Sequence, residues 1–541
     1  MTTSIPPLVL AASDVWAGND GNWSTWAIKV GSSLQQFNII PSTSHGEIWV
    51  PGPQGCTGSP APLQCAESRG VGELQGQQSL GFQENASTTW EQIGIYEFVT
   101  GEDLFQTTEA GLYGLDDVVI GENNITVKHA TVAGVVTKDF WLGSFGMAQI
   151  HSEFPVRSGS VPSLLDGMKE ENLTSTASFG LSVGAAYSEC QHVSLRGHTN
   201  TSIAESSPGS LVIGGYDQEL YRDPGVEITV VANATRPLET HVRNIVASNT
   251  LNGTQSATFG LPSLPVAIDS GVSQLWLPRE VCENLAGALG LTYDNSTELY
   301  LVNDTAHARL LELSPEFTFT LGANATSRET TNIVLPYAAF DLEVGQPFYN
   351  TSRRYFPIRQ SPDDNLYVLG RAFLQEAYLV VDWERGNFTL WQNTHHSSGN
   401  AILAIQPIGD EDGSGGIRPA VIAGIVLGVL LGLIAVLTAV YIFLRRKRKA
   451  SRRSPDRNAT PSPFPEDKKD PGTPEMPDTG VVIVEASSVP IHELYQEPPP
   501  QQAMSTPVFE LSGATAEKEL DTVPSMAAEG EQKSAMLEYR R

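Results

Sequence analysis

An uninterrupted apolar run from Ala420 to Leu444 constrains the folding of this chain more than any other feature. The run, AVIAGIVLGVLLGLIAVLTAVYIFL, carries no charged side chain and is long enough to cross a hydrocarbon core of about 30 Å as a helix. We therefore predict a transmembrane helix over residues 420–444. The basic segment RRKRKASRR (445–453) follows directly. Because basic residues that flank a span stay in the cytoplasm, everything before Ala420 is predicted to lie on the outer side.

Sequons for asparagine-linked glycosylation divide along the chain in the same way. Only Asn458 follows the apolar run, and the other sequons precede it, as expected for an ectodomain that passes through the secretory pathway. The predicted acceptors are Asn22, Asn85, Asn124, Asn172, Asn200, Asn233, Asn252, Asn295, Asn303, Asn324, Asn350 and Asn387. This pattern predicts a single-pass type I membrane protein with an extracellular or lumenal ectodomain, located at the cell surface. The N-terminal MTTSIPPLVLAAS lacks a basic segment, so we expect that the secretory signal is missing from this sequence.

Charge and cysteine content narrow the partners and the compartment. The 541-residue chain has a formal net charge of −28 at pH 7, and a surface so acidic repels phosphate groups. Nucleic acid is therefore not a predicted partner, and no metal or cofactor is predicted. In an oxidising compartment Cys56 and Cys65 can close a short loop through a disulfide, whereas Cys190 and Cys282 either pair or stay free.

The region before the apolar run has the pattern of a β protein. From about residue 15 to residue 393, short β-branched or alternating segments are separated by Gly, Asn, Asp and Pro turns, which predicts a mostly β fold. The best helix candidates are residues 162–173 and 278–290. A β-rich region of this length is expected to form two lobes.

The segments on either side of the apolar run differ from this β region. Residues 395–419 are polar and glycine-rich near the membrane and are predicted to form a stalk. Residues 445–541 are rich in Pro, Glu and Ser, and are predicted to be a disordered cytoplasmic tail, because such a segment cannot bury enough apolar surface to fold. Its Ser-Pro and Thr-Pro pairs leave two alternatives open, a tail that binds a cytoplasmic partner and an unmodified disordered tail.

Several motifs carry a resemblance to a known family. LPVAIDSGVSQLWLP (264–278) places Asp269-Ser270-Gly271 on a tight turn between apolar strands, which suits a carboxylate held rigidly at the floor of a cleft. NLYVLGRAFLQEAYLVVDWERGNFTLW (365–391) follows downstream, and GLYGLDDVVIG, DFWLGSFG, PSLLDGMKEENL and GSLVIGGYD precede the turn in the family's order. Over residues 7–393 the chain thus resembles pepsin-type aspartic proteases.

The resemblance implies a bilobal fold with a substrate cleft between an N-terminal lobe, residues 1–220, and a C-terminal lobe, residues 221–394. It also implies that each lobe supplies one Asp from an Asp-Thr/Ser-Gly turn. One carboxylate deprotonates a water while its protonated partner polarises the scissile carbonyl, because like charges about 3 Å apart share a proton. Asp269 is the implied catalytic residue of the second lobe, retained here, and a peptide or protein is the implied ligand of the cleft.

The corresponding turn of the first lobe lacks its carboxylate. WAIKVGSSLQQFNIIPSTSHGEIWVP (26–51) has the frame that the family shows around this turn, and counting back from the Trp-Val-Pro places Ser42-Thr43-Ser44 where the family has Asp-Thr-Gly. A serine hydroxyl cannot share a proton with a carboxyl group or hold the hydrolytic water as an anion would. His45 and Glu47 do not occupy the tip of the turn, so neither is expected to replace the missing Asp.

The flap that covers substrate is a second departure from the family. IGIYEFVTGEDLFQTTEAG (93–111) contains Tyr96 and Gly101 but no Tyr-Gly-x-Gly hairpin. We therefore predict a membrane-anchored, aspartic-peptidase-like ectodomain that is catalytically impaired and acts by binding peptides or cell-surface partners. The alternative is an active, membrane-anchored aspartic endopeptidase that hydrolyses peptide bonds at acidic pH, which requires another carboxylate beside Asp269.

Overall fold

The computed structural model describes residues 5–98, 110–121, 123–156, 159–187, 207–232, 236–253, 256–259, 263–363 and 366–408. The chain divides into two compact units, Met1–Ile417 and Arg418–Arg541, and the second lies outside the described residues. The predicted transmembrane helix at 420–444 and the predicted disordered tail at 445–541 therefore also lie outside them. Among the helices of the described residues, none is long and apolar enough to cross a membrane.

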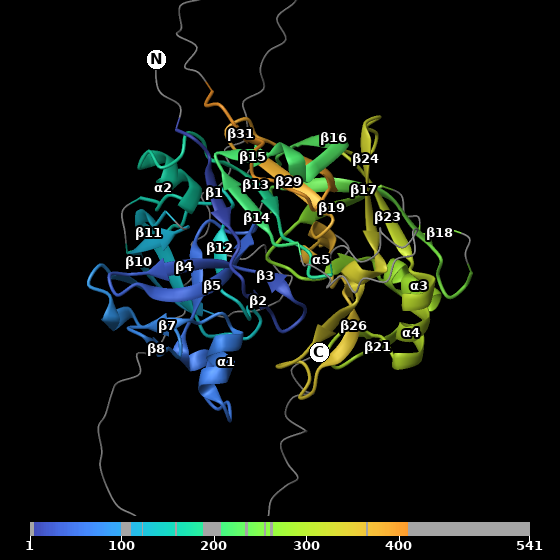
Figure 1. Cartoon of the computed structure of the whole chain (residues 1–541), viewed down its shortest axis with the longest axis horizontal. Helices are drawn as coiled ribbons and strands as arrows, with labels where there is room; N and C mark the ends of the chain where they lie inside the picture. The colour runs from blue at the N-terminus through green and yellow to red at the C-terminus, as the bar shows by residue number, and fades with distance from the viewer. Residues whose placement is uncertain are drawn as a thin grey trace, which may run out of the picture. The chain divides into compact units, whose positions relative to one another are not determined.

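The described part of the chain is mostly β, as predicted (Figure 1). One sheet of the N-terminal half has the strand order β11-β6-β12-β5-β4-β10-β9. Its strands are β4 (Trp26–Val30), β5 (Gln35–Ser42), β6 (Ile48–Pro51), β9 (Glu91–Glu97), β10 (Ala110–Ile120), β11 (Ile125–Val135) and β12 (Ser144–Gly146). In this sheet β12 lies between β5 and β6, parallel to the first and antiparallel to the second.

A sheet of the C-terminal half repeats this arrangement, in the order β24-β23-β17-β19-β28-β20-β27 with β18 paired to β17. Its strands are β17 (Glu239–Ser248), β18 (Ala257–Thr258), β19 (Leu264–Ile268), β20 (Leu275–Leu277), β23 (Glu316–Gly322), β24 (Thr330–Pro336), β27 (Ile358–Gln360) and β28 (Val368–Leu369). Here β28 lies between β19 and β20, again parallel to the first and antiparallel to the second. The ends of β5 and β19 are thus equivalent positions in the two halves.

A six-stranded sheet joins the two halves, in the order β1-β14-β13-β29-β30-β16. Its strands are β1 (Leu8–Ala11), β13 (Ser178–Ser182), β14 (Ser210–Ile213), β16 (Tyr221–Thr229), β29 (Ala377–Asp382) and β30 (Asn387–Asn393). Strands from both predicted lobes therefore contribute to one sheet. Most of the buried apolar side chains belong to a single cluster that contains residues of all three sheets.

Shorter strands complete the fold. They are β2 (Trp16–Ala17), β3 (Trp23–Ser24), β7 (Glu73–Leu74), β8 (Gln77–Gln78), β15 (Gly215–Asp217), β21 (Thr292–Asp294), β22 (Leu299–Leu301), β25 (Leu342–Val344), β26 (Arg353–Phe356) and β31 (Ile402–Ala404). Strand β31 differs from the prediction, because it falls in the segment predicted as a stalk, residues 395–419. It pairs with β15, so the first part of that segment packs on the domain.

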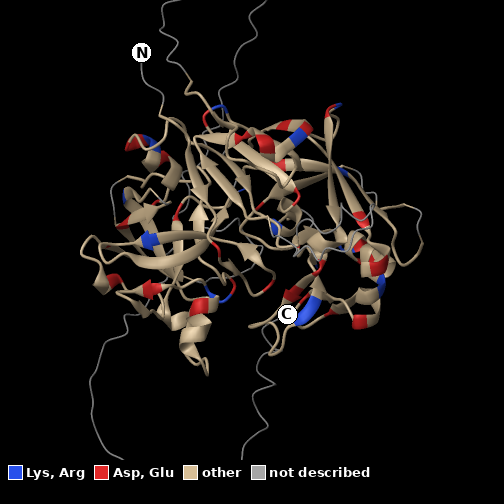
Figure 2. Ribbon diagram, in the orientation of Figure 1, with Lys and Arg blue, Asp and Glu red and all other residues tan. Residues whose placement is uncertain are grey.

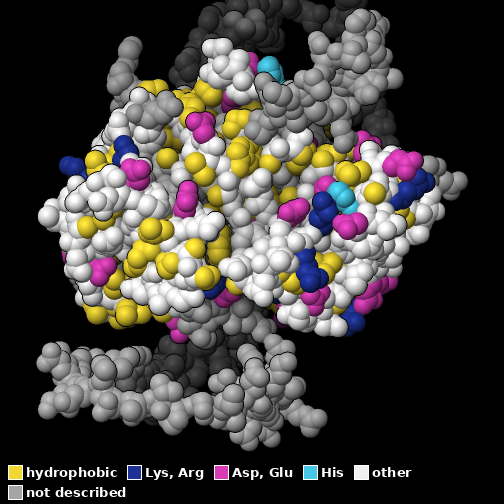
Figure 3. All heavy atoms as spheres, turned by 60° about the horizontal axis from the view of Figure 1, so that its bottom comes forward, with side chains coloured by type: hydrophobic (Ala, Val, Ile, Leu, Met, Phe, Trp, Pro, Cys, Tyr) yellow, Lys and Arg dark blue, Asp and Glu magenta, His cyan; other side chains and the backbone are white. Residues whose placement is uncertain are grey.

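The α-helices are α1 (Pro62–Ser68), α2 (Leu164–Glu170), α3 (Arg279–Leu289), α4 (Asp304–Leu313) and α5 (Arg371–Leu374). Both predicted helices are present as α2 and α3. Ser163 caps α2 by accepting a hydrogen bond from the Asp166 amide, and α3 ends at Gly290, whose φ of 67° is in the left-handed region. Acidic side chains are spread over both halves (Figure 2), and they outnumber basic ones in the sequence. On the face shown in Figure 3, charged and apolar side chains are interspersed.

Candidate active site

The two predicted turns face each other at equivalent ends of the two sheets. Thr43 follows β5 and Ser270 follows β19, and each side chain binds the other turn. The Thr43 amide donates to Ser270 Oγ at 3.1 Å and the Ser270 amide donates to Thr43 Oγ1 at 3.0 Å. The two hydroxyls also donate to backbone carbonyls of the opposite half, Thr43 to Ile268 at 3.2 Å and Ser270 to Pro41 at 2.8 Å. This reciprocal set holds the turns in one fixed relation.

The side chains beside this set differ between the turns. On the C-terminal side, Asp269 Oδ1 accepts a hydrogen bond from the Gly271 amide at 2.7 Å. On the N-terminal side, Ser42 Oγ lies 2.9 Å from Ser44 Oγ. A methyl group placed on Gly271 would lie 2.8 Å from Ser42 Oγ, 3.0 Å from Asp269 Oδ1 and 3.1 Å from Ser44 Oγ, so all three oxygens converge around this glycine. The structure thus places Ser42 opposite Asp269.

The Asp269 carboxyl group is buried, with 5% of its surface exposed. Burial raises its pKa above the ordinary value, and the hydrogen bonds from Gly271 and Ser44 and the positive charges of Arg371 and Arg236 lower it, with burial the larger effect. The protonated form is therefore favoured relative to an exposed Asp. The two charged groups that lower this pKa, Arg371 and Arg236, are both cationic.

Sequence reasoning did not single out Arg371, which lies beside this floor. Its guanidinium Nη1 donates to the carbonyls of Ser270 and Gly271, each at 2.9 Å, and Nη2 lies 3.8 Å from Asp20. The guanidinium also lies 4.8 Å from the centre of the Trp23 ring. An arginine inside the motif NLYVLGRAFLQEAY was the available signal, but its position relative to Asp269 depends on the tertiary fold.

His45 and Glu47 are buried and are bound away from the turn tip. The His45 ring stacks on Trp49 with centroids 3.9 Å apart, and its Nε2 lies 2.8 Å from Ser144 Oγ. Burial lowers its pKa to about 3, so the ring is neutral at physiological pH. Burial raises the pKa of Glu47, whose oxygens accept from Trp49 Nε1 at 2.9 Å and Ser152 Oγ at 2.7 Å. Both side chains are thus held by hydrogen bonds to partners other than Ser42 and Asp269.

A compartment of about 70 Å³ lies over the two turns. Trp49, Phe140, Trp141 and Leu142 provide apolar walls. Its lining contains two carboxylates besides Asp269. Asp139 is exposed, and Asp20 accepts hydrogen bonds from Trp23 Nε1 at 2.8 Å and from the Ser273 hydroxyl.

The flap segment is described only in part. Tyr96 lies on β9, and its ring contacts those of Tyr113 and Phe154, with centroids 6.2 Å and 5.2 Å away. Gly101 lies outside the described residues, as does the rest of the segment from residue 99 to 109.

The remaining predicted sites are the cysteines and the glycosylation acceptors. Cys56 and Cys65 form a disulfide, Cys282 is a buried free thiol, and Cys190 lies outside the described residues. The Asn side chains of the described sequons are exposed, apart from the partly buried Asn387. Asn200 and Asn233 lie outside the described part of the chain. Among the described residues, no group of three or more His, Cys, Asp or Glu could hold a metal ion.

The repeated sheets and the paired turns define a pepsin-like aspartic peptidase domain, and comparisons with known proteins agree. The chain matches the family described as eukaryotic aspartyl protease over residues 25–391. Secreted aspartic protease 8 of Candida albicans is 22% identical over 70% of this chain and 78% of its own. Cathepsin E of Cavia porcellus is 24% identical over 66% and 78%, and barrierpepsin of Saccharomyces cerevisiae is 24% identical over 39% and 34%. The chain belongs to the eukaryotic aspartyl protease family, which confirms the resemblance.

Proposed function

We propose that this protein is a single-pass type I membrane protein whose pepsin-like domain lies outside the cytoplasm, at the cell surface, and binds peptides or surface partners with impaired catalysis. The observation that carries the proposal is the composition of the floor. Ser42 stands opposite Asp269, the Ser44 hydroxyl lies beside them, and the charges that lower the Asp269 pKa are those of Arg371 and Arg236.

Aspartic peptidase chemistry requires one carboxylate that is charged and one that is protonated at the same time. A lone Asp269 can be in either state but cannot supply both. Burial raises its pKa, so it suits a hydrogen-bond donor to a peptide carbonyl more than a general base. Ser42 Oγ and Ser44 Oγ add hydroxyls that donate and accept. This set can bind a peptide backbone and leaves the attacking water without its base.

The membrane proposal rests on the sequence. The apolar run at 420–444, the basic segment after it and the sequons before it support an ectodomain followed by a span and a cytoplasmic tail. Tags at the two ends of the full chain test this topology. When protease is added to intact cells, it should remove the tag at the N-terminal end and spare the tag after residue 541. Equal protection of both tags would contradict it.

The second candidate is an active aspartic endopeptidase that works at acidic pH. Asp20 and Asp139 favour it, because both line the compartment that holds Asp269. For either to act, it would have to leave its present position and approach Asp269. Cleavage by the wild-type protein distinguishes the two candidates.

The test compares cleavage of a broad peptide library by the purified ectodomain across acidic pH, with and without a statine-type inhibitor. Ser42→Asp restores a second carboxylate, and we expect it to raise inhibitor-sensitive cleavage at least about 100-fold over wild type, since a positioned acid–base group contributes about 10²–10⁴-fold. Ser42→Asn, similar in size but uncharged, is the matched control and should stay inactive. Inhibitor-sensitive cleavage by wild type that is lost in Asp269→Asn would establish the enzyme instead.

A further inference from the structure

A short hairpin between β2 and β3 extends into the space between the two halves of the molecule (Figure 1). It is built on Trp23, which is 2% exposed. Gly18 and Gly21 have φ angles of 146° and 151°, and a Cβ atom at either position would approach the Trp23 ring to within 2.7 Å. The indole Nε1 donates to Asp20 at 2.8 Å. The tip of the hairpin, Gly18 to Gly21, is thus held in a defined conformation.

The tip is bound to the C-terminal half. Asn19 accepts a hydrogen bond from the Gly345 amide at 2.7 Å through its carbonyl, and its Nδ2 donates to the Gln346 carbonyl at 3.1 Å. The Tyr355 hydroxyl donates to the Asp20 carbonyl at 2.5 Å, and the Ser273 hydroxyl donates to the Asp20 carboxylate. A segment near the N-terminus is therefore tied across the space between the halves.

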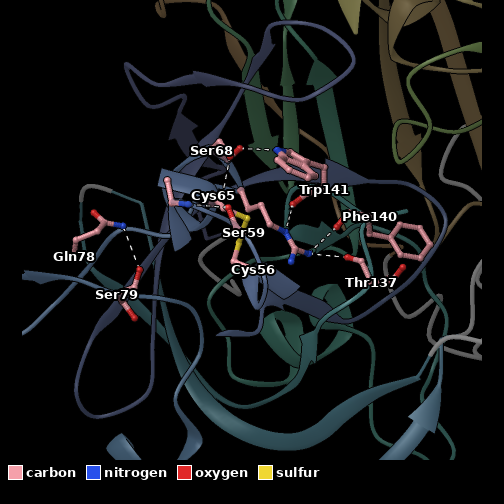
Figure 4. The surroundings of a disulfide bond; sticks show 11 residues. Cys56, Ser59, Cys65, Ser68, Gln78, Ser79, Thr137, Phe140 and Trp141 are labelled. Atoms are coloured by element: carbon pink, nitrogen blue, oxygen red, sulfur yellow. Dashed lines mark hydrogen bonds between the residues drawn. A yellow bond between two sulfur atoms is a disulfide. The ribbon is translucent and has the colours of Figure 1, made fainter. Parts of the chain in front are cut away.

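Trp141, from the N-terminal half, lines the same compartments as Gly18 and Asn19 at the tip of the hairpin. Its indole Nε1 donates to the Ser68 carbonyl at 2.8 Å, at the end of α1 (Figure 4). Arg69 lies 5.8 Å from the ring centre and donates to the carbonyls of Thr137, Phe140 and Trp141 at 2.8, 3.2 and 3.1 Å. The disulfide between Cys56 and Cys65 links the middle of α1 to the segment before it (Figure 4).

Gly18, Asn19 and Trp141 lie where two compartments adjoin, because all three line both of them. The first is the compartment of about 70 Å³ over Asp269. The second has a volume of about 740 Å³ and a polar lining that includes Gln64, Asp341 and Glu343. Asp20 lines only the first, and Asn22 lines only the second. We call Gly18, Asn19 and Trp141 the partition.

We propose that the partition closes one end of the compartment over Asp269, so that this site takes a peptide whose chain ends there and not one that runs through. The inference rests on the proposed peptide-binding function and restricts the ligands to peptides that end at the partition. An internal segment would have to continue past Gly18, Asn19 and Trp141, whereas a chain terminus would not. The second compartment then holds nothing that belongs to the same extended peptide.

The test uses the purified ectodomain and three mixtures of short randomised peptides: one blocked at both ends, one extended by a Gly-Ser tail at the amino end, and one extended at the carboxyl end. Bound peptides are quantified by mass spectrometry after gel filtration. We expect an extension at one of the two ends to weaken binding at least about tenfold, equivalent to about 1.4 kcal/mol. Asn19→Gly combined with Trp141→Ala should abolish that penalty.

Two further variants keep the outcome interpretable. Asn19→Gly alone removes one side chain from the partition. It provides a second reading if the double variant does not fold. Gln64→Ala changes the second compartment only and should leave the penalty as in wild type. Equal binding of all three mixtures by wild type, or a penalty that both partition variants leave unchanged, would overturn the partition while the peptide-binding function stands. Binding of no mixture by any of the proteins would overturn that function, and the inference with it.

Discussion

The two turns at the cleft floor have the same backbone and different chemistry. Each follows a strand in an equivalent place, β5 or β19, and each gives its middle hydroxyl residue, Thr43 or Ser270, to the reciprocal hydrogen bonds. The first residue is Ser42 in one turn and Asp269 in the other. The third residue is Ser44 in one and Gly271 in the other.

This comparison shows that the scaffold and the chemistry of the floor depend on different atoms. The reciprocal bonds use backbone groups and the middle side chain, and none of them uses the carboxylate of Asp269 or the hydroxyl of Ser42. A serine at the first position of the turn is therefore compatible with the lobe contact. The turns also differ in their surroundings, since the Arg371 cation binds the C-terminal turn, whereas the N-terminal turn is followed by a neutral His45 that stacks on Trp49.

Arg371→Met is expected to have the largest effect, because this buried cation donates to two carbonyls of the C-terminal turn. The substitution leaves the carbonyls of Ser270 and Gly271 without their donor and removes the positive charge near Asp20. Loss of one partner from a buried charged network costs about 3–5 kcal/mol, and we expect about 4 kcal/mol in urea unfolding. Arg279→Met, in an exposed pair with Glu283, is the control and should cost less than about 1 kcal/mol. Equal losses would mean that Arg371 does not support the turn.

The frame of both turns could be predicted from the sequence because it depends on local pattern. An apolar strand, a small polar turn and a second apolar strand surround Ser42 and Asp269 alike, and a chain with that pattern places its turn at a sheet end. The mostly β fold and the helices α2 and α3 followed from periodicity in the same way.

Other features depend on pairings that the local sequence does not contain. Gly-Asn-Asp-Gly at 18–21 indicates a turn but not that its tip binds Gly345 in the other half. Residues 395–408 are polar and were predicted as part of a stalk, yet β31 pairs with β15, because a short strand forms wherever a sheet edge accepts its backbone. In the sequence, Arg371 is a single charged residue within an apolar motif. Its contacts with Trp23 and with the Ser270 carbonyl are visible only in the folded structure.

His45→Gln sharpens the comparison through pH. The pKa of His45 is lowered from 6.5 to about 3 by burial, so the folded state binds fewer protons than the unfolded state, and stability is lost as pH falls below 6.5. By pH 5 this loss is about 2 kcal/mol, from 1.5 pH units at about 1.36 kcal/mol each. In the His45→Gln variant, the free energy of unfolding measured in urea should not show this loss between pH 7.5 and pH 5. Ile48→Val, a buried change without a titrating group, should retain it, and a wild-type slope in His45→Gln would contradict the assignment.

Ser44→Ala is expected to have the smallest effect, and it tests the third positions of the turns. The Ser44 hydrogen bond lowers the Asp269 pKa, so its removal raises that pKa further above the ordinary value. A raised pKa means that the folded state holds the proton more tightly, so stability is full in acid and is lost as pH rises through the folded pKa. We therefore expect Ser44→Ala to cost about 1 kcal/mol at pH values above the folded-state pKa, where the carboxylate is charged, and less at pH values below it.

The same substitution in an Asp269→Asn background separates this pH effect from simple loss of a contact. Asparagine cannot ionise, so Ser44→Ala should then cost the same at every pH, as measured by urea unfolding from pH 4 to 8. A pH-dependent cost that survives in the Asp269→Asn background would mean that Ser44 acts on another group. A pH-independent cost in the wild-type background would mean that Ser44 binds Ser42 alone. In that case the floor would consist of two separate half-sites, and Asp269 would receive from the N-terminal turn nothing that adjusts its charge.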